Sequence, residues 1–320
     1  MKIVQQPKSL SIVIPVYNSA EILPELVSQL SAFLPLIADD FEIILVNDGS
    51  HDDSWKTIQK LAQITPTIRG FTMMRNYGQH NALLCGIRAA CKDVIVTMDD
   101  DLQHPPEEIT KLLLALEQGC EVVYGFPQKE QHGFLRTLAS QMTKIALQKS
   151  MGAETARNIS AFRAFPAGLR KAFNDYRSPF VSIDVLLTWG ASRFISVPVR
   201  HEQRKSGISN YTFMKLLTHA FNMMTGFSVL PLQVASFLGF ACALLGLFIL
   251  VYVIGRYLLL GYSVPGFPFL ASIISIFSGA QLLAIGIIGE YLARMHFRMM
   301  ERPTYTVKES TSKDGSDENR

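Results

Sequence analysis

The sequence has few cysteines and, over one long stretch, almost no charge. Its four cysteines form no Cys-x-x-Cys pair and lack the spacing of metal ligands, which argues against a disulfide framework. Between Leu216 and Gly289 the only charged residue is Arg256, although the chain has 30 Lys and Arg and 27 Asp and Glu. This gap excludes a fully soluble protein, and its confinement to one stretch excludes a transporter with many spans.

Two common nucleotide-binding signatures are missing as well. The chain has neither a Gly-x-x-x-x-Gly-Lys phosphate loop nor a Gly-x-Gly-x-x-Gly motif, so nothing supports an NTPase or a dinucleotide-binding enzyme. The net charge of +3 gives no reason to expect a nucleic-acid partner.

Short β-branched runs alternate with helical patterns through the first part of the chain. We predict strands at residues 10–16, 41–47, 70–74, 93–98 and 121–124, and helices at 21–33, 54–63, 79–90 and 106–118. This alternation is typical of an α/β fold with a mostly parallel sheet, whose ligands bind at the carboxyl ends of the strands. Three polar clusters follow predicted strands: Tyr17-Asn18, Asp48-Gly49-Ser50 and Asp99-Asp100-Asp101. They predict a site at that edge.

The acidic cluster carries the clearest chemistry. Asp99 and Asp101 are two residues apart, so on an extended backbone they point the same way. Two carboxylates with the amide oxygen of Gln103 suit a divalent cation that leaves positions open for phosphate oxygens. The alternative is an acidic turn that caps the helix predicted to follow.

The other two clusters are weaker signals. Asp48 could accept hydrogen bonds from a base or a ribose, but Asp-Gly-Ser is also a common turn. Arg75, three residues before Gly78, could face a phosphate or cap the sheet.

Two stretches of the middle of the chain have helical amphipathic patterns. Residues 134–151 fit a basic helix on a membrane surface, or a surface helix packed on the domain. Residues 211–227 carry an apolar stripe that leads into the uncharged stretch, which favours an interfacial helix over a core helix. Residues 193–200 resemble another strand.

Two membrane spans are predicted, at residues 231–255 and 268–289, because either helix is long enough to cross a hydrocarbon core of about 30 Å. Basic residues lie before and after the pair: Arg200, Arg204, Lys205, Lys215, Arg294, Arg298, Arg302 and Lys308. The positive-inside rule then places both termini and the large domain in the cytoplasm, on the inner membrane.

The predicted domain organisation has four parts. A cytoplasmic domain occupies residues 1–210, a juxtamembrane helix 211–228, the two-helix membrane module 229–290, and a cytoplasmic tail 291–320. In the tail, residues 302–307 could form a short strand that adds to a neighbour's sheet in a homo-oligomer. Residues 311–320 have the composition of a disordered tail.

Several motifs in order resemble a known family. Ser11–Asn18, Asn47–Ser50, Arg75–Gly78 and Asp99-x-Asp101-x-Gln103 resemble inverting family 2 glycosyltransferases with a GT-A fold. With two C-terminal spans, the chain is similar to polyprenyl-phosphate glycosyltransferases. It looks most like the GtrB-type bactoprenol glucosyltransferases and, more distantly, dolichyl-phosphate mannose synthases.

The resemblance assigns roles to individual residues on the donor side. It implies that Pro15, Tyr17 and Asp48 hold the nucleoside, with Arg75 nearby. Asp99 and Asp101 are the acidic positions of the Asp-x-Asp motif, and Asp101 with Gln103, beside Asp99, would bind Mg²⁺ or Mn²⁺ on the donor diphosphate. Arg163 ends a segment similar to one whose arginine faces the phosphates.

The acceptor side is assigned by the stretch before the membrane. The resemblance implies that Arg200, Arg204, Ser209 and Tyr211 meet the lipid phosphate, and that Arg204 acts in catalysis beside Asp99 and Asp101. Arg204 could instead anchor the chain to anionic head groups. Ser19 and Asn210 depart from the pattern, since many relatives have an acidic residue and a lysine there. The departure at Asn210 puts an additional acceptor contact in doubt.

The resulting prediction is an inverting, metal-dependent transfer of one hexose from a UDP-sugar to undecaprenyl phosphate. Glucose is the first expectation for the sugar, with GDP-mannose or a modified amino-sugar nucleotide as alternative donors. The Gln-x-x-Arg-Trp signature of processive synthases is absent, which favours single-sugar transfer. A lipid phosphate is already anionic at neutral pH, so a dedicated base is less necessary. A non-catalytic subunit that binds nucleotide sugars is the remaining alternative.

Overall fold

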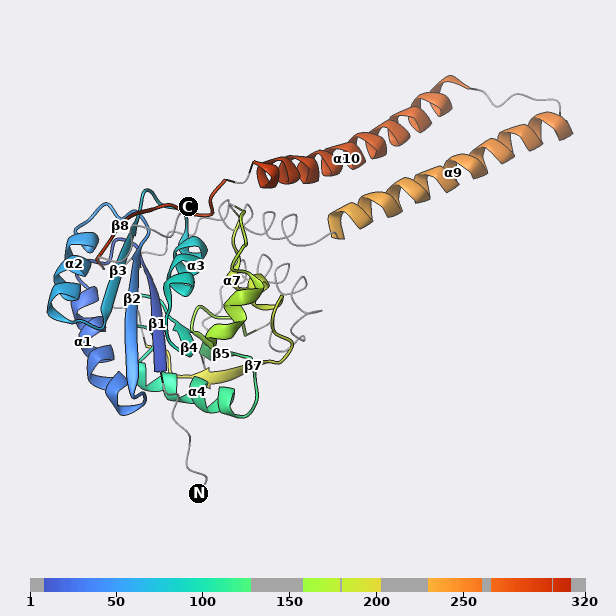
Figure 1. Cartoon of the computed structure of the whole chain (residues 1–320). Coiled ribbons are helices and arrows are strands. Elements are labelled where there is room, and N and C mark those ends of the chain that lie inside the picture. The colour runs from blue at the N-terminus through green and yellow to red at the C-terminus, as the bar shows by residue number, and fades with distance from the viewer. Residues whose placement is uncertain are drawn as a thin grey trace. The chain divides into compact units, whose positions relative to one another are not determined.

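The computed structural model describes residues 9–127, 158–178, 180–202, 230–260, 266–300 and 302–311. The chain divides into two compact units, one of Met1–Leu217 with Glu301–Arg320 and one of Thr218–Met300 (Figure 1). The residues after the second apolar helix therefore return to the first unit.

The first unit is built on one sheet of eight strands in the order β7-β5-β6-β4-β1-β2-β3-β8. β1 pairs in parallel with β2 and β4, β2 pairs in parallel with β3, and β5 pairs in parallel with β7. β6 is antiparallel to β4 and β5, and β8 is antiparallel to β3. The strands are Ser9–Val16 (β1), Asp40–Asn47 (β2), Ile68–Met73 (β3), Val94–Thr97 (β4), Val122–Pro127 (β5), Arg163–Pro166 (β6), Phe194–Val199 (β7) and Val307–Ser310 (β8).

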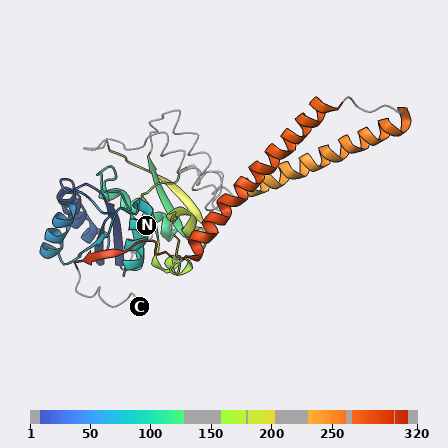
Figure 2. The same cartoon turned by 90° about the horizontal axis from the view of Figure 1, so that it is seen from above.

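Helices cover the sheet on two faces, as turning the molecule shows (Figure 2). The described helices of this unit are Leu23–Phe33 (α1), Leu34–Leu36 (η1), Ser54–Ile64 (α2), Gln79–Ala89 (α3), Pro106–Glu108 (η2), Ile109–Glu117 (α4), Ala167–Ala172 (η3) and Ile183–Leu187 (α7). Side chains alternate across a strand, so Ile12 and Ile14 of β1 pack toward α1. Val13 points to the opposite face, against Gly86 of α3, where an added Cβ would lie 2.4 Å from Val13 Cγ1.

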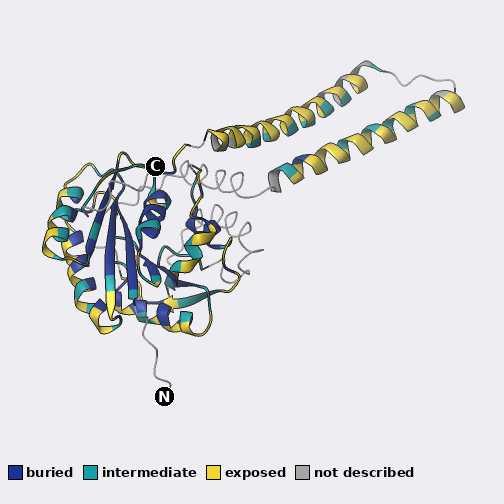
Figure 3. Cartoon of the chain, in the orientation of Figure 1, coloured by how far each residue is buried: buried dark blue, intermediate teal, exposed yellow. Residues whose placement is uncertain are grey.

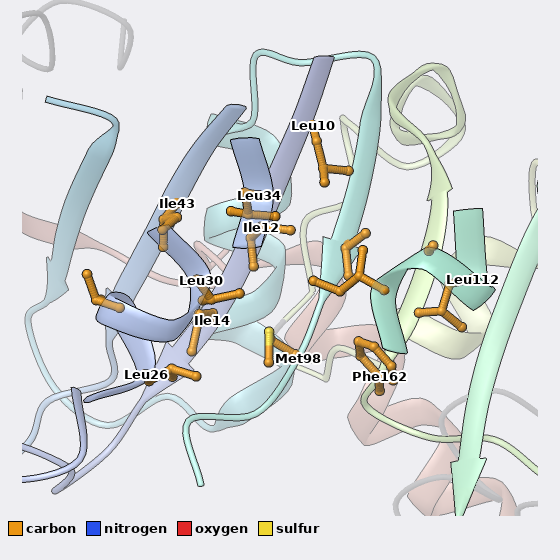
Figure 4. Close-up of a cluster of buried hydrophobic side chains, with 14 of the residues drawn as sticks. Leu10, Ile12, Ile14, Leu26, Leu30, Leu34, Ile43, Met98, Leu112 and Phe162 are labelled. Carbon is orange, nitrogen blue, oxygen red and sulfur yellow. The ribbon is translucent and has the colours of Figure 1, made fainter. Parts of the chain in front are cut away.

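A core cluster lies between the sheet and helices α1 and α4. Leu26 and Leu30 of α1 point toward Ile12 and Ile14, and Leu112 of α4 lies near Phe162 (Figure 4). These side chains are fully buried, and the central strands β1, β2 and β4 are buried over most of their length (Figure 3). The loops at the strand ends are thus attached to a buried, well-packed core.

The predicted α/β sheet is confirmed, with strand and helix limits close to those expected from periodicity. β6, η3 and α7 were not predicted. The predicted strand at 302–307 is corrected: β8 spans Val307–Ser310 and pairs with β3 of the same chain rather than with a neighbour's sheet. The predicted amphipathic stretches at 134–151 and 211–227, and residues 312–320 of the tail, lie outside the described residues.

The second unit contains two long helices, Leu230–Leu260 (α9) and Phe267–Met299 (α10). Segments Leu232–Arg256 and Ile276–Ala293 are long and apolar enough to cross a membrane, as the uncharged stretch predicts. The two helices pack on each other, and at Gly246 an added Cβ would lie 3.0 Å from the ring of Phe277. Large apolar side chains are exposed along both helices, for example Phe237 and Leu282, as expected of surfaces that face lipid.

Candidate active site

The carboxyl ends of β1, β2, β3 and β4 carry most of the predicted donor-side residues, because parallel neighbours end at the same edge. Asp48, just after β2, accepts hydrogen bonds from the backbone N–H groups of Tyr77 (2.7 Å) and Gly78 (2.9 Å). Its side chain is buried, and this burial raises the pKa of Asp48 even though both N–H groups lower it. In this arrangement Asp48 positions the loop after β3.

Gly49 allows the loop after β2 to approach the loop after β3 closely. Its φ is +65°, and an added Cβ would lie 2.5 Å from the backbone carbon of Arg75, so no other residue fits without moving the loop. The Arg75 guanidinium lies over the ring of Tyr77 at 4.7 Å, and Arg75 is exposed. An exposed cation at this edge is placed to meet an anionic ligand.

Polar side chains also join the loop after β1 to the loop after β2. Asn18 has φ 55°; its N–H donates to Ser50 Oγ at 2.9 Å, and its Oδ1 accepts from the N–H of His51 at 2.8 Å. Tyr17 is 40% exposed, with its ring edge-on to His51. Pro15 is buried in β1, beyond the last residue pair that β1 forms with β4, where its missing N–H removes no bond from that pairing.

The three acidic residues after β4 have different surroundings. Gln79 Nε2, in the first turn of α3, donates to Asp99 Oδ1 at 2.6 Å. Asp100 accepts from the N–H of Tyr17 at 3.3 Å, and burial raises its pKa, with a further contribution from the charge of Asp101. Asp101 is 6% exposed and accepts from the N–H of Gln103 at 3.1 Å. The cluster is therefore held by donors from the loop after β1, from helix α3 and from its own turn.

The turn from Asp101 to Gln103 contains an unusual backbone conformation. Leu102 has φ 59°, a left-handed geometry that costs a non-glycine residue roughly 1–2 kcal/mol. Its side chain is buried in the core, which offsets that cost. The buried Leu102 thus anchors the turn between two polar residues of the site.

The residues at this turn fit a hard divalent cation. Asp99 and Asp101 supply carboxylate oxygens, and Gln103 donates through Nε2 to the Glu202 carbonyl at 3.5 Å, so its Oε1 is the oxygen left for a ligand. Within the described residues no group of three His, Cys, Asp or Glu side chains could hold a metal ion. Two carboxylates and one amide oxygen would leave positions on a cation for water or phosphate oxygens, as Mg²⁺ and Mn²⁺ sites do.

Arg163, expected to face the donor phosphates, is instead buried in an ion pair. Its Nη1 lies 2.5 Å from Asp184 Oδ1, an oxygen that also accepts from the Tyr124 hydroxyl at 3.0 Å. Arg163 is 2% exposed. Burial and the charge of Asp184 raise the pKa of Tyr124 well above its usual value. This geometry gives Arg163 a structural contact between β6 and α7.

Arg200, expected on the acceptor side, is bound by carboxylates of the η2 turn. Its Nε lies 2.8 Å from Glu108 Oε1, and its Nη2 lies 3.6 Å from Glu107 Oε2. The remaining predicted acceptor residues, Arg204, Ser209 and Tyr211, lie outside the described residues.

Gln79 and Glu108 are contact residues of the site that the sequence did not single out. Gln79 is the first residue after a glycine with φ +97°, which is a signal for a helix start but not for a bond to Asp99. Glu108 follows Glu107 in Pro-Pro-Glu-Glu, and nothing in that pattern tells which of the two carboxylates is buried.

The family model for glycosyl transferase family 2 matches residues 11–177. The chain is 34% identical over 308 residues to the undecaprenyl-phosphate 4-deoxy-4-formamido-L-arabinose transferase of Pectobacterium carotovorum subsp. carotovorum (strain PC1), covering 95% of this chain and 94% of that protein. It is 32% identical over 311 residues to the transferase of that name from Proteus mirabilis (strain HI4320), covering 96% and 95%.

A solved structure agrees at the level of the fold. Glucosyl-3-phosphoglycerate synthase from Mycobacterium tuberculosis, crystallised with Mn²⁺, UDP and phosphoglyceric acid, superposes with a TM-score of 0.50 and 19% identity, covering 68% of this chain and 76% of that one. The sequence matches extend over nearly the whole chain and show its family. The chain belongs to glycosyl transferase family 2 and is a glycosyltransferase with a GT-A fold.

Proposed function

We propose that the protein transfers one sugar from a nucleotide sugar to undecaprenyl phosphate. The observation that carries this proposal is the 34% identity over 95% of the chain to a transferase named for that acceptor. The matched length includes the two apolar helices as well as the sheet domain, so both parts of the chain have counterparts in that relative. The reaction takes place at the membrane that holds the lipid.

For the donor we propose a modified amino-sugar nucleotide of the 4-deoxy-4-formamido-L-arabinose class, carried on UDP. The names of the relatives favour this alternative over UDP-glucose, which the resemblance to bactoprenol glucosyltransferases puts first. No described residue of the site distinguishes the two sugars.

The donor end of the site is assigned to the edge formed by the loops after β1–β4. Tyr17 and Pro15 border the nucleoside, Arg75 faces the phosphates, and Asp48 holds the Arg75 loop from beneath. Asp101 and Gln103, with Asp99, would hold Mg²⁺ or Mn²⁺, which when bound offsets negative charge on the departing nucleoside diphosphate.

The acceptor supplies its own nucleophile. A lipid phosphate is anionic at neutral pH because its second pKa is about 6, so one of its oxygens can attack the sugar carbon without a protein base. Direct displacement inverts the configuration at that carbon. Asp100 is not needed as a base, and its raised pKa reflects burial. Arg204, Ser209 and Tyr211 are proposed to hold the acceptor phosphate, a role that suits an arginine in particular.

We place the enzyme in the inner membrane, with α9 and α10 as its spans and the sheet domain in the cytoplasm. The positive-inside distribution of Arg and Lys supports this orientation.

The test is a donor screen with the full chain. Membranes containing the protein are incubated with undecaprenyl phosphate, Mg²⁺ or Mn²⁺, and one of three donors: UDP-4-deoxy-4-formamido-L-arabinose, UDP-glucose or GDP-mannose. The lipid product is then identified by mass. We expect one pentosyl lipid and little hexosyl product. A hexosyl lipid alone would overturn the donor assignment, and no glycolipid with any donor would overturn the function.

A further inference from the structure

Three consecutive residues after β7 each contact the turn that follows the acidic cluster. Arg200 contacts Glu108, His201 contacts His104, and Glu202 contacts Gln103. We call this arrangement the clasp, formed by residues 200–202 against residues 103–108. The order of the contacts is reversed along the two segments, so they run past each other in opposite directions.

The strongest contact of the clasp is an ion pair with one buried partner. Glu108 is 2% exposed. It accepts from the backbone N–H of Arg200 at 3.1 Å and from Arg200 Nε at 2.8 Å, and Lys111 Nζ lies 2.5 Å away. Although burial raises the pKa of Glu108, the bonds from Lys111 and Arg200 outweigh it and lower that pKa. A buried carboxylate satisfied in this way fixes both the backbone and the side chain of Arg200.

The middle contact is a stack of rings. His201 meets His104 edge-on with ring centroids 5.1 Å apart, and His104 stacks on Phe162 at 4.8 Å. His104 is 6% exposed, and its Nδ1 has no hydrogen-bond partner among the described residues. A buried imidazole with an unpaired nitrogen is costly, so packing rather than hydrogen bonding holds it between the two segments.

The third contact reaches the predicted cation site. The N–H of Glu202 donates to the Gln103 carbonyl at 2.9 Å, and the Gln103 amide lies 3.5 Å from the Glu202 carbonyl. Gln103 thus bonds Glu202 through its backbone and its side chain. Arg204, proposed to hold the acceptor phosphate, follows Glu202 by two residues in the sequence.

We propose that the clasp couples the two ends of the active site, with Glu108 as its positioning residue. It joins the start of the segment that binds the lipid phosphate to the turn that binds the donor diphosphate. Displacement at the sugar carbon requires the attacking oxygen and the leaving group to be aligned, and misplacement by about 1 Å can cost about 100-fold in rate. The inference rests on the proposed function, because it assigns the acceptor to residues beyond 202.

The test compares two neighbouring carboxylates. Glu108→Gln keeps the size of the side chain and one acceptor oxygen but removes the charge that holds Arg200. Glu107→Gln is the matched control, because the Glu107 side chain is 57% exposed and lies 3.6 Å from Arg200. Each variant of the full chain is measured in detergent for the KM of undecaprenyl phosphate, for binding of that lipid by native mass spectrometry, and for binding of UDP with Mn²⁺ by calorimetry.

We expect Glu108→Gln to raise the KM and weaken the binding of undecaprenyl phosphate about tenfold, the lower end of losses seen when supporting contacts of a site are removed. UDP binding should stay within about twofold of the parent, and Glu107→Gln should resemble the parent. If Arg200 bound the lipid phosphate directly, Glu108→Gln would free it and the KM would fall or stay unchanged. That result would overturn the positioning role of the clasp. An equal loss of affinity for undecaprenyl phosphate and for UDP, together with a lower melting temperature, would also overturn it.

Arg200→Gln keeps the inference testable if Glu108→Gln does not fold, because it breaks the same pair from its exposed side. The KM for the lipid should again rise, and the double variant should be no worse than either single variant, since both remove one interaction. Multiplied effects in the double variant, or an unchanged KM for Arg200→Gln, would contradict the proposal. A parent chain that makes no glycolipid would instead count against the proposed function.

Discussion

The two halves of the sheet use charged side chains in different ways. In the parallel half, β1–β4, carboxylates at the strand ends accept hydrogen bonds from loop N–H groups, and Arg75 is exposed beside them. In the half formed by β5, β6 and β7, Arg163 is buried on Asp184 and Arg200 is bound by Glu108. At the strand ends, the first half therefore leaves Arg75 exposed beside hydrogen-bonded carboxylates, whereas the second half pairs both of these arginines with carboxylates. Away from the strand ends the parallel half also has an ion pair with a buried carboxylate, between Glu42 of β2 and Arg69 of β3 at 2.8 Å.

This difference shows that an arginine at the end of a strand has no fixed role. What decides its role is the partner that the fold brings to it, and that partner can be distant in the sequence, as Glu108 is from Arg200.

The largest effect is expected from Arg163→Met, which removes the cation of the buried pair. Asp184 would remain buried beside Tyr124 with no positive partner in that pair, a situation that costs about 3–5 kcal/mol. For a domain of this size the melting temperature should fall by roughly 10 °C, measured on the full chain by its intrinsic fluorescence.

The matched control is the double variant Arg163→Met with Asp184→Asn, which removes both charges and should recover part of the loss. If Arg163→Met melted like the parent but bound UDP poorly, Arg163 would be a ligand residue and the contrast between the halves would fail.

In the parallel half, Asp101→Asn should lower activity strongly without affecting stability. An asparagine oxygen can still accept from the N–H of Gln103, and loss of one of three adjacent charges relieves repulsion on Asp100. We expect the rate of lipid glycosylation to fall about 100- to 1000-fold, the range for removing a group that stabilises developing charge. A variant as active as the parent, or one that melts well below it, would remove the distinction drawn between the two halves.

The sequence predicts the parallel half well, because long apolar runs alternate with amphipathic helices and each strand end is marked by polar residues. It did not predict β6, whose four residues Arg163–Pro166 are too short to show a period. It placed the last strand at residues 302–307 instead of Val307–Ser310, because the actual strand carries two charged residues and lies at a sheet edge. The acidic cluster was located correctly at the end of β4, but the partners of Arg163 and Arg200 were not foreseeable, because contacts across the sheet leave no local pattern.

The smallest effect is expected at the boundary, where His104 stacks on Phe162 and meets His201. Burial, with a contribution from His201, lowers the pKa of His104 from 6.5 to about 4. Between these values the unfolded chain binds a proton that the folded chain does not, so stability is complete above pH 6.5 and declines as the pH falls toward 4. The loss is about 2 kcal/mol by pH 5.

His104→Phe keeps a ring on Phe162 but cannot bind a proton, so its melting temperature should fall less than that of the parent between pH 7 and pH 5. Parallel pH profiles for the two proteins would mean that His104 is accessible to solvent and that the two halves are not packed together at this point.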